Sequence, residues 1–388
     1  MTNEELWKKI ERGLSNITPK CQLNFEMHLV EHCNLNCKLC GHFSPLAEEE
    51  YTDVSSYRRD CNRLSELFDG EMATILLMGG EPLLHPQVTE FMRITREGFP
   101  VGNISIVTNG LLLPTMPDDF WAACRKYDII IAPTCYPIKF DYAGLKKIAD
   151  SKGVKYTPFD YVHSTHQKLF PICSTDTKRL DIEGTKHFLN CMNATNCVTL
   201  KNGKMFPCPQ AAHASHLKKY FNLDIHLSEK DGVDIYSVKS GNELLEKLSR
   251  PIPFCRYCDV TDNHISCDWG ISRKDRYEWL TFGFTEDDMK YLKTKKPVVY
   301  IFGAGKWGTQ AVNLLLNERI VIKYVLSTRK KQGIDNILGI PIVTLDELGE
   351  VEPNSVCLVA LGSPLHKSEV YPILSQIGFG DVVPVAEI

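Results

Sequence analysis

The sequence lacks the features that mark membrane-spanning, exported and disordered proteins. None of its apolar runs reaches the roughly 18 residues that a membrane helix needs. Residues 1–14 are charged and amphipathic, without the apolar core of a signal peptide. The 388 residues are 43% hydrophobic and 24% charged, which is too apolar for a disordered chain. We therefore expect a cytoplasmic globular protein of roughly two or three domains.

An excess of one charge is also missing, as are internal repeats and low-complexity tracts. The formal net charge is −4 at pH 7. Nucleic-acid and membrane surfaces are normally recognised through a basic excess. We therefore expect neither nucleic acid nor a membrane among the partners.

Cysteine, in contrast, is abundant. The chain has 15 cysteines, an odd number, and several are closely spaced. A reducing compartment disfavours a disulfide framework. Clustered cysteines in such a protein indicate a metal site, an iron–sulfur cluster or catalysis, and their spacing decides between these.

Apolar runs alternate with helical patterns in the first part of the chain. Strands are expected at 24–30, 73–78, 103–107, 128–132 and near 154–157. Helices are expected between them, at 56–67, 87–97, 119–126 and 142–151. This alternation predicts an α/β fold with a parallel sheet or barrel.

The pattern changes twice further along. Residues 173–275 are rich in Cys, Asn, Lys and Pro and have weak periodicity, so a metal centre is expected to stabilise them. A second α/β pattern starts at residue 297. The expected division is a lead-in helix at 1–20, a parallel α/β domain at 21–180, a cysteine-rich domain at 181–275, a charged linker or helix at 276–296, and a small α/β domain at 297–388.

The first cysteine cluster follows the first expected strand. Three residues separate Cys33 from Cys37, and two separate Cys37 from Cys40. Three thiolates on one loop can hold a [4Fe–4S] cluster and leave one iron open to a small molecule. The alternative is zinc, with His32 or His42 as the fourth ligand. The spacing favours iron–sulfur.

This loop resembles the signature of the radical S-adenosylmethionine (radical SAM) superfamily. Two further motifs follow in the family's order: Met78-Gly79-Gly80-Glu81-Pro82 ends the second strand, and Thr108-Asn109-Gly110 ends the third. The match covers about residues 22–165. It implies a partial (β/α)6 TIM-like barrel with the site at the C-terminal ends of its strands.

The resemblance also implies a mechanism and its ligands. The cluster on Cys33, Cys37 and Cys40 would reduce SAM to methionine and a 5′-deoxyadenosyl radical, which abstracts hydrogen from the substrate. Electrons would come from a donor such as flavodoxin or ferredoxin. The SAM contacts implied by the motifs are Gly79, Gly80, Glu81 and Pro82 at the methionine amino group, and Thr108 and Asn109 near the ribose.

A second set of cysteines lies in the irregular segment: Cys191, Cys197, Cys208, Cys255, Cys258 and Cys267. Structural zinc is one interpretation. The spacing also resembles the auxiliary-cluster region of radical SAM proteins, called SPASM or, when shortened, twitch. We expect one auxiliary [4Fe–4S] cluster, with two possible. Cys191, Cys208, Cys255 and Cys258 match the twitch spacing; Cys197 is an alternative to Cys191, and Cys267 is a spare or belongs to a second site.

Cys135 ends an expected barrel strand and is a candidate hydrogen-atom donor, as epimerising members of the family require. Cys173 is a second candidate. A small packing or bystander thiol is the alternative for both.

The C-terminal segment carries a glycine motif. Gly303, Gly305 and Gly308 form G-x-G-x-x-G between an expected strand and helix, which is the setting of a phosphate-binding turn. The next strand ends in Ser327-Thr328-Arg329 without a carboxylate, which disfavours NAD. We expect a Rossmann-like module that either binds a nucleotide or phosphate or serves as a scaffold.

Taken together, the sequence predicts a radical SAM enzyme of oxidoreductase or epimerase type. The expected substrate is a carbohydrate or nucleotide-linked small molecule such as a sugar nucleotide. Peptide modification is an alternative activity. A non-catalytic iron–sulfur or zinc redox protein is the alternative from another class, although such a protein has no need of the two SAM-site motifs.

Overall fold

The computed structural model describes residues 24–161, 167–169, 172–173, 181–191, 193–194, 196–223, 225–258, 265–267, 269–274, 278–281, 286–329, 333–361, 364–379 and 381–384. They form two compact units. The first takes the described residues within Met1–Leu169, Thr177–Cys258 and Ser266–Lys274, and the second takes those within Phe170–Asp176, Asp259–Ile265 and Asp275–Ile388. No described helix is long and apolar enough to cross a membrane.

An eight-stranded sheet organises the first unit, with the strand order β10-β9-β8-β1-β2-β3-β4-β5. Strands β1 to β5 are parallel to their neighbours, and β8 is parallel to β1 on its other side. The strands are β1 Asn24–Val30, β2 Thr74–Gly79, β3 Asn103–Thr108, β4 Ile129–Cys135, β5 Asp160–Tyr161, β8 Val198–Lys201, β9 Lys204–Phe206 and β10 Val233–Asp234.

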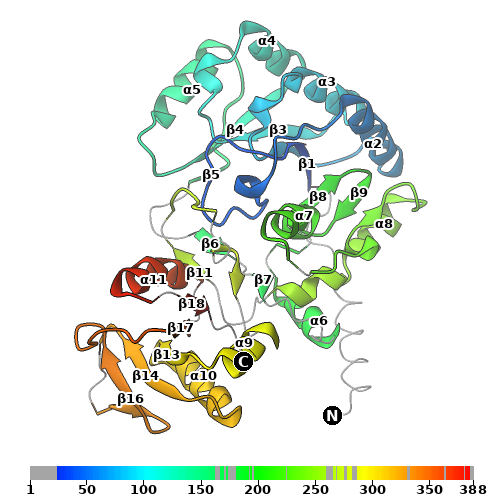
Figure 1. The fold of residues 1–388 in the computed structure, drawn as a ribbon. Helices are drawn as coiled ribbons and strands as arrows, with labels where there is room; N and C mark the ends of the chain where they lie inside the picture. Colours follow the sequence, from blue (N-terminus) through cyan, green and yellow to red (C-terminus); the bar gives the residue numbers. More distant parts are fainter. Residues whose placement is uncertain are drawn as a thin grey trace. The chain divides into compact units, whose positions relative to one another are not determined.

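Helices connect the parallel strands and form a layer along one side of the sheet (Figure 1). The helices of this unit are α2 Val54–Leu67, α3 Val88–Gly98, α4 Asp118–Lys126, α5 Tyr142–Ser151, α6 Asp181–Asn190, α7 Pro209–Phe221 and α8 Gly241–Leu248. Shorter 3-10 turns are η1 Ser44–Leu46, η2 Pro82–Leu84, η3 Leu113–Thr115, η4 Glu229–Asp231 and η5 Pro253–Tyr257. The mixed α/β class with successive parallel strands is confirmed.

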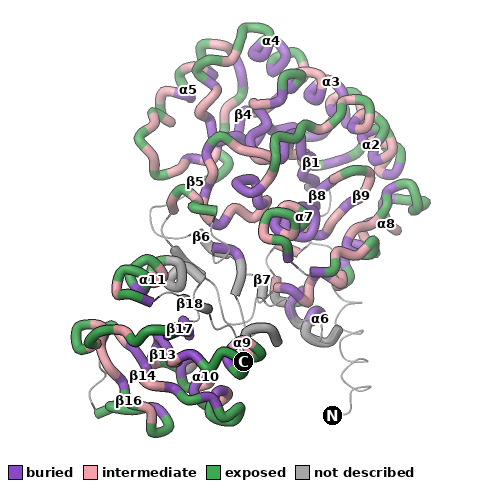
Figure 2. The backbone as a smooth tube through the Cα atoms, in the orientation of Figure 1, coloured by how far each residue is buried: buried purple, intermediate pink, exposed green. Residues whose placement is uncertain are grey.

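The alternation of β1 separates two environments. Phe25, Met27 and Leu29 belong to the large apolar core between the sheet and its helices, where Figure 2 shows buried chain along the strands. Glu26 and His28 project from the opposite face because side chains alternate along a strand, and both are also buried. This inner face therefore carries polar groups at β1.

Two details differ from the sequence expectation. The chain from residue 154 runs beside β4 as expected, but strand β5 is confined to Asp160–Tyr161, with a single earlier bridge between Ile131 and Tyr156. Thr157 N donates to Ile131 O and Phe159 N donates to Pro133 O, so the donor missing between them is Pro133 of β4, which has no amide hydrogen to give to Thr157 O. The cysteine-rich segment also contributes β8, β9 and β10 to the barrel sheet.

The second unit contains a six-stranded sheet of order β15-β16-β14-β13-β17-β18, in which β13, β14, β16, β17 and β18 are parallel. This order is that of a Rossmann-like sheet. Its elements are α9 Glu286–Lys295, β13 Val298–Phe302, α10 Lys306–Asn317, β14 Ile322–Ser327, β15 Asn336–Ile337, β16 Ile340–Thr344, β17 Ser355–Val359, α11 Pro364–Ile377 and β18 Asp381–Pro384. Helix α9 lies in the interval expected as a charged linker or helix, and its Leu292 joins the apolar core.

Short strand pairs complete the described chain. Strand β6, Gln167–Leu169, pairs with β11, Ile265–Cys267, and β7, Ile172–Cys173, pairs with β12, Leu280–Thr281. The expected lead-in helix at 1–20 lies outside the described residues.

Candidate functional site

The three-cysteine loop begins three residues after β1. Its backbone turns through left-handed conformations at Asn36 (φ 52°) and Leu39 (φ 64°). The segment from Gly270 to Ser272 fastens the loop, because Lys38 N donates to Gly270 O at 2.7 Å and Ser272 N donates to Asn36 O at 2.8 Å. The loop is therefore held in a fixed shape by backbone hydrogen bonds.

The loop brings the thiols of Cys33, Cys37 and Cys40 together. Burial raises the pKa of Cys33 to about 12, with smaller contributions from Glu81 and Cys40. Burial and the neighbouring Cys40 likewise raise the pKa of Cys37 to about 12. Burial raises the pKa of Cys40 as well. Metal-free thiols here keep their protons, and a bound cation would be needed to hold three thiolates in such a space.

The glycine pair at the end of β2 packs directly on the start of this loop. A Cβ on Gly79 would lie 2.4 Å from Val30 O, and one on Gly80 would lie 2.1 Å from His32 O. Gly80 N donates to Val30 O at 2.7 Å, and Glu81 N donates to His32 O at 3.1 Å. The second motif is therefore built onto the first through backbone contacts.

Glu81 joins the second motif to the third. Its carboxylate is fully buried and accepts from Thr108 Oγ1 at 2.6 Å, Asn109 N at 2.8 Å and Leu83 N at 3.0 Å. Burial raises the pKa of Glu81 to about 7, although these hydrogen bonds oppose the shift. Pro82 opens the short turn η2 and is buried. The structure thus directs the side chains of Glu81 and Thr108 toward each other.

Asn109 reaches back to the cysteine loop. Its Nδ2 donates to Asn34 Oδ1 at 2.7 Å and lies 3.7 Å from Cys33 Sγ, at hydrogen-bond range for sulfur. Cys33 Sγ also accepts from Leu35 N at 3.4 Å. All three motifs from the sequence therefore meet at one end of the parallel sheet.

Cys135 ends β4 and is buried. Burial, followed by the nearby Asp160, raises its pKa. Because β4 runs parallel to β3, Cys135 at the end of β4 lies at the same end of the sheet as the Asn109 turn that follows β3. The side chain of the second candidate, Cys173, lies outside the described residues.

Four cysteines of the second set are also brought together. Burial raises the pKa of Cys208 well above its usual range, and Cys255, Cys191 and Cys197 contribute in that order. Cys208 caps α7, whereas Cys255 lies on η5, which packs against α6. Cys258 N donates to Cys255 O at 3.3 Å, so Cys258 follows one turn later. The side chain of Cys267 lies outside the described residues.

The glycine motif of the second unit uses its glycines differently. A Cβ on Gly303 would lie 2.4 Å from Ala360 O, and one on Gly308 would lie 1.7 Å from Gly303 O. Gly303 and Gly308 are therefore needed because the backbone packs against them too closely to leave room for a side chain. Gly305 faces open space at the start of α10, beside a cavity of about 150 Å³ that Ser327 and Arg329 help to line.

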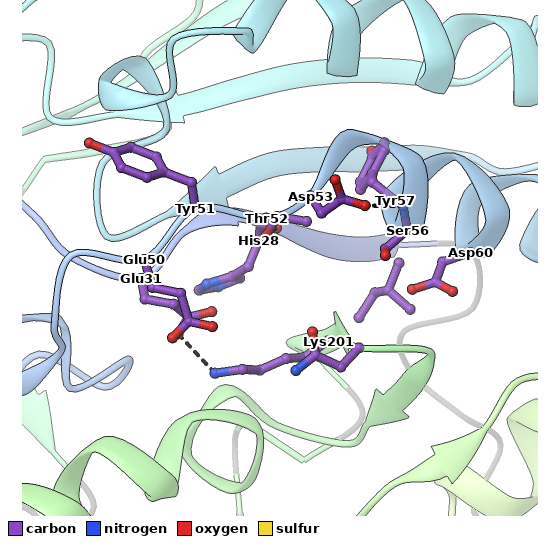
Figure 3. Close-up of a pocket in the computed structure, with 12 residues that line it drawn as sticks. His28, Glu31, Glu50, Tyr51, Thr52, Asp53, Ser56, Tyr57, Asp60 and Lys201 are labelled. Atoms are coloured by element: carbon purple, nitrogen blue, oxygen red, sulfur yellow. Dashed lines mark hydrogen bonds and ion pairs between the residues drawn. The ribbon is translucent and has the colours of Figure 1, made fainter.

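The sequence analysis considered His32 and His42 only as alternative zinc ligands and did not single out His28 or His213, yet His28, His42 and His213 gather near the cysteine loop. Figure 3 shows His28 of β1, Glu31 and Lys201 of β8 pointing toward one another at a cavity of about 220 Å³. His213 of α7 also contacts Glu31 there. The alternation of β1, which puts Glu26 and His28 on the inner face, is the sequence signal that could have indicated this cluster.

Comparison with known proteins gives partial matches. No family model matches the chain. A protein named GTP 3′,8-cyclase from Chlorobaculum tepidum is 33% identical over 87 residues, which are 22% of this chain and 25% of that protein. A second GTP 3′,8-cyclase, from Peptoclostridium acidaminophilum, is 25% identical over 138 residues, 34% of this chain and 42% of that protein. The chain thus spans less than half the length of these relatives.

Solved structures show distant likeness. The structure of BtrN in complex with AdoMet and 2-DOIA has a TM-score of 0.39 at 18% identity, and the match covers 63% of this chain and 98% of the BtrN chain. Streptococcus suis SuiB bound to S-adenosylmethionine has a TM-score of 0.29 at 18% identity, and the match covers 39% of this chain and 43% of the SuiB chain. Native anSMEcpe with bound AdoMet has a TM-score of 0.36 at 9% identity, and the match covers 62% of this chain and 84% of the anSMEcpe chain.

The cysteine loop, the glycine pair and the Asn109 turn pack together at one end of the parallel sheet. In these motifs and in their placement the chain resembles the radical SAM superfamily.

Proposed function

We propose that this protein is a radical SAM enzyme in which Cys33, Cys37 and Cys40 bind a [4Fe–4S] cluster that activates SAM. The observation that carries the proposal is the joining of three separate motifs. Gly80 leaves no room for a side chain against His32 O, Glu81 accepts from Asn109 N, and Asn109 reaches Cys33. A redox protein without a SAM pocket would not require this assembly.

The residues present fit the cluster. Three buried or half-buried thiols on one loop supply thiolate ligands and leave a fourth position for a small molecule. When bound, the reduced cluster supplies the electron that cleaves the sulfonium bond of SAM. The Asn109 amide donates to the sulfur of Cys33, while the backbone amides of Leu35 and Asn36 act to lower the pKa of this thiol.

The inner face of the sheet suits radical chemistry. Leu76, Met78, Val107 and Ala132 form an apolar cluster on β2, β3 and β4. Apolar walls exclude water from a reactive intermediate. Cys135 ends β4 at the same end of the sheet and is our candidate hydrogen-atom donor, which favours an epimerase among the possible outcomes.

For the second cysteine set we propose one auxiliary [4Fe–4S] cluster in a twitch-like region. Cys255, Cys191 and Cys197 all contribute to the raised pKa of Cys208, which supports a shared site. Cys258 lies one turn from Cys255. The ligand set we propose is Cys191, Cys208, Cys255 and Cys258, with Cys197 as the alternative to Cys191. Such a cluster would accept an electron in an oxidation.

We propose a carbohydrate or nucleotide-linked small molecule as the substrate, with flavodoxin or ferredoxin as the electron donor. The supporting feature is the C-terminal glycine turn, where Gly305 opens onto a cavity with Arg329 at its wall. A helix N-terminus with a nearby guanidinium suits a phosphate group. Calorimetry with UDP and ADP checks this: we expect binding that Arg329→Ala weakens, and no heat for either nucleotide would contradict it.

Electron paramagnetic resonance tests the SAM site. Anaerobically reconstituted, reduced protein should show a [4Fe–4S]+ signal that changes when SAM is added. Cys37→Ser should remove the SAM-sensitive signal and keep the auxiliary one. Cys124→Ala, a buried cysteine on α4 outside both sets, is the matched control and should retain both. Signals that do not change when SAM is added would favour the alternative of a non-catalytic redox protein.

A further inference from the structure

Three imidazoles pack together on the inner side of the sheet, next to the cysteine loop. His28 lies on β1, His42 follows the loop, and His213 lies on α7. The ring centroids are 4.6 Å apart for His28 and His42, 4.1 Å for His28 and His213, and 5.5 Å for His42 and His213. His28 and His213 are only 4% and 0% exposed.

Four nitrogen atoms of these rings are buried without a hydrogen-bond partner among the described residues. They are both nitrogens of His28, Nε2 of His42 and Nε2 of His213. Buried polar atoms in native proteins are nearly always paired with protein, water or an ion. Four unpaired ring nitrogens in one cluster therefore point to an ion or water molecules as their partners.

Glu31 orients one of these rings. Its Oε2 lies 2.9 Å from His213 Nδ1, and Lys201 Nζ lies 3.2 Å from the same nitrogen, so Nε2 is the ring nitrogen of His213 that has no partner among the described residues. A carboxylate that holds one imidazole nitrogen while the other binds a metal is the usual arrangement around metal-ligating histidines. Glu31 also contacts Lys201 Nζ at 2.9 Å and His216 Nε2 at 2.5 Å, so its charge is already matched.

Glu26 offers an oxygen ligand, and within the described part of the chain its carboxylate forms no ion pair with a lysine, arginine or histidine. Its ligand atom and those of His28 and His42 lie within 4.8 Å of one another. His28 belongs to a second group of this kind with Glu31 and His213. Thr199 Oγ1 donates to Glu26 Oε2 at 3.0 Å, which fixes the carboxylate on the inner face of the sheet. His28 is shared by both groups and therefore lies at the centre.

We propose that His28, His42, His213 and Glu26 bind one divalent transition-metal ion, distinct from the iron–sulfur clusters. Imidazole nitrogens with one carboxylate oxygen suit zinc and ferrous iron, whereas calcium and magnesium prefer oxygen alone. The ion would connect the cysteine loop through His42 to β1 and α7, and so stiffen the base of the SAM site.

The charge state of the histidines agrees with this site, whereas burial raises the pKa of Glu26 to about 7, so that a bound cation would be needed to hold it as the carboxylate. Metal binding requires neutral imidazole. Burial lowers the pKa of His213 to about 4 and that of His28 well below its usual range, so both rings are neutral near pH 7. The alternative occupant is a group of buried water molecules, which would pair the same nitrogens.

Zinc X-ray absorption distinguishes these possibilities and does not depend on activity. Holoprotein with reconstituted clusters would be stripped with a mild chelator and given one equivalent of zinc, so that the cysteines already hold iron. We expect about one zinc per chain with nitrogen and oxygen neighbours at roughly 2.0–2.1 Å and no sulfur shell near 2.3 Å. No retained zinc, or zinc bound by sulfur alone, would overturn the proposal.

Variants assign the ligands. His28→Ala and His213→Ala should lose the zinc and keep the iron, whereas His226→Ala, an exposed histidine of the same unit, should keep both. Glu26→Gln retains an acceptor for Thr199, so it tests the site even if an alanine variant fails to fold. We expect it to weaken zinc affinity at least about tenfold. Unchanged zinc affinity in folded His28→Ala or Glu26→Gln would contradict the assignment.

Discussion

Gly80 shows how a single backbone contact can position the whole site. Its amide donates to Val30 O, and its α-carbon faces His32 O so closely that a methyl group would lie 2.1 Å from that oxygen. Real Cβ atoms do not approach an oxygen this closely, so any side chain here must push the cysteine loop away from β2.

We therefore predict that Gly80→Ala displaces the loop. Unfolding stability should fall by about 2 kcal/mol or more, in the range of overpacked buried sites. Iron content after reconstitution should fall with it. Gly349→Ala is the control, since a Cβ there meets nothing within 4 Å. Denaturant titration and iron analysis would check both, and a Gly80→Ala protein with normal iron content would count against this packing.

Glu81 is predicted to make stability depend on pH. Its pKa is raised to about 7 in the folded protein, so the folded state holds a proton that the unfolded state releases above its ordinary carboxyl pKa of 4.5. Stability from this group is fully present below about pH 4.5 and is lost as the pH rises toward 7, by up to about 1.4 kcal/mol per unit.

Glu81→Gln should remove that pH-dependent component, and should also place an NH₂ group against donors such as Asn109 N. We expect a loss of about 1–3 kcal/mol at neutral pH. Urea unfolding of both proteins from pH 5 to 8 measures the difference. Parallel stability curves would show that Glu81 does not titrate in this window.

At this scale, spacing predicts part of the site. Cys33, Cys37 and Cys40 can be recognised from the sequence because they are closely spaced along the chain. The convergence of His28 and His213 has no such signal, since 184 residues separate the two and only the pairing of distant strands brings them together.

At the scale of elements, Arg96 ties the loops at the far end of the barrel strands. Arg96 lies on α3, and its guanidinium donates to the backbone carbonyl oxygens of five residues: Phe99, Pro100, Gly102, Tyr127 and Asp128. These carbonyls belong to the loops before β3 and β4. One side chain therefore fixes two strand entries at once.

We predict that Arg96→Ala destabilises the first unit by about 2–4 kcal/mol, because it leaves several carbonyls without donors. Arg93→Ala on the same helix removes only surface ion pairs with Glu90 and Glu97 and should cost less than about 1 kcal/mol. Thermal unfolding of the two variants compares them directly. Equal losses would show that Arg96 has no special role.

Periodicity predicts the elements well where their neighbours are local. The observed helices α2 to α5 start and end within about two residues of the expected ranges, since caps and apolar spacing are local signals. The parallel pairing of β8 with β1 could not be foreseen, because Val198 and Phe25 meet only through the tertiary fold.

At the scale of the whole molecule, the second unit contains a complete sheet and its own apolar core. The strands from β13 to β18, and the core residues from Leu292 to Ala360 that pack with them, all come from residues 286–384. The core of the first unit takes no residue from this stretch. Such self-contained cores are typical of independently folding domains.

We therefore predict that a fragment of residues 286–388 folds alone. It should show mixed α/β circular dichroism and one cooperative thermal transition. A fragment that is unfolded, or that melts without cooperativity, would show that it requires the rest of the chain.

The most direct test of the central claim is the formation of 5′-deoxyadenosine. Reconstituted protein would be reduced without oxygen and incubated with SAM, with and without candidate sugar nucleotides, and the products analysed by mass spectrometry. We predict 5′-deoxyadenosine from the wild-type chain and from Cys124→Ala, and none from Cys37→Ser. No 5′-deoxyadenosine from protein with intact clusters and any candidate substrate, or equal amounts from Cys37→Ser, would contradict the account.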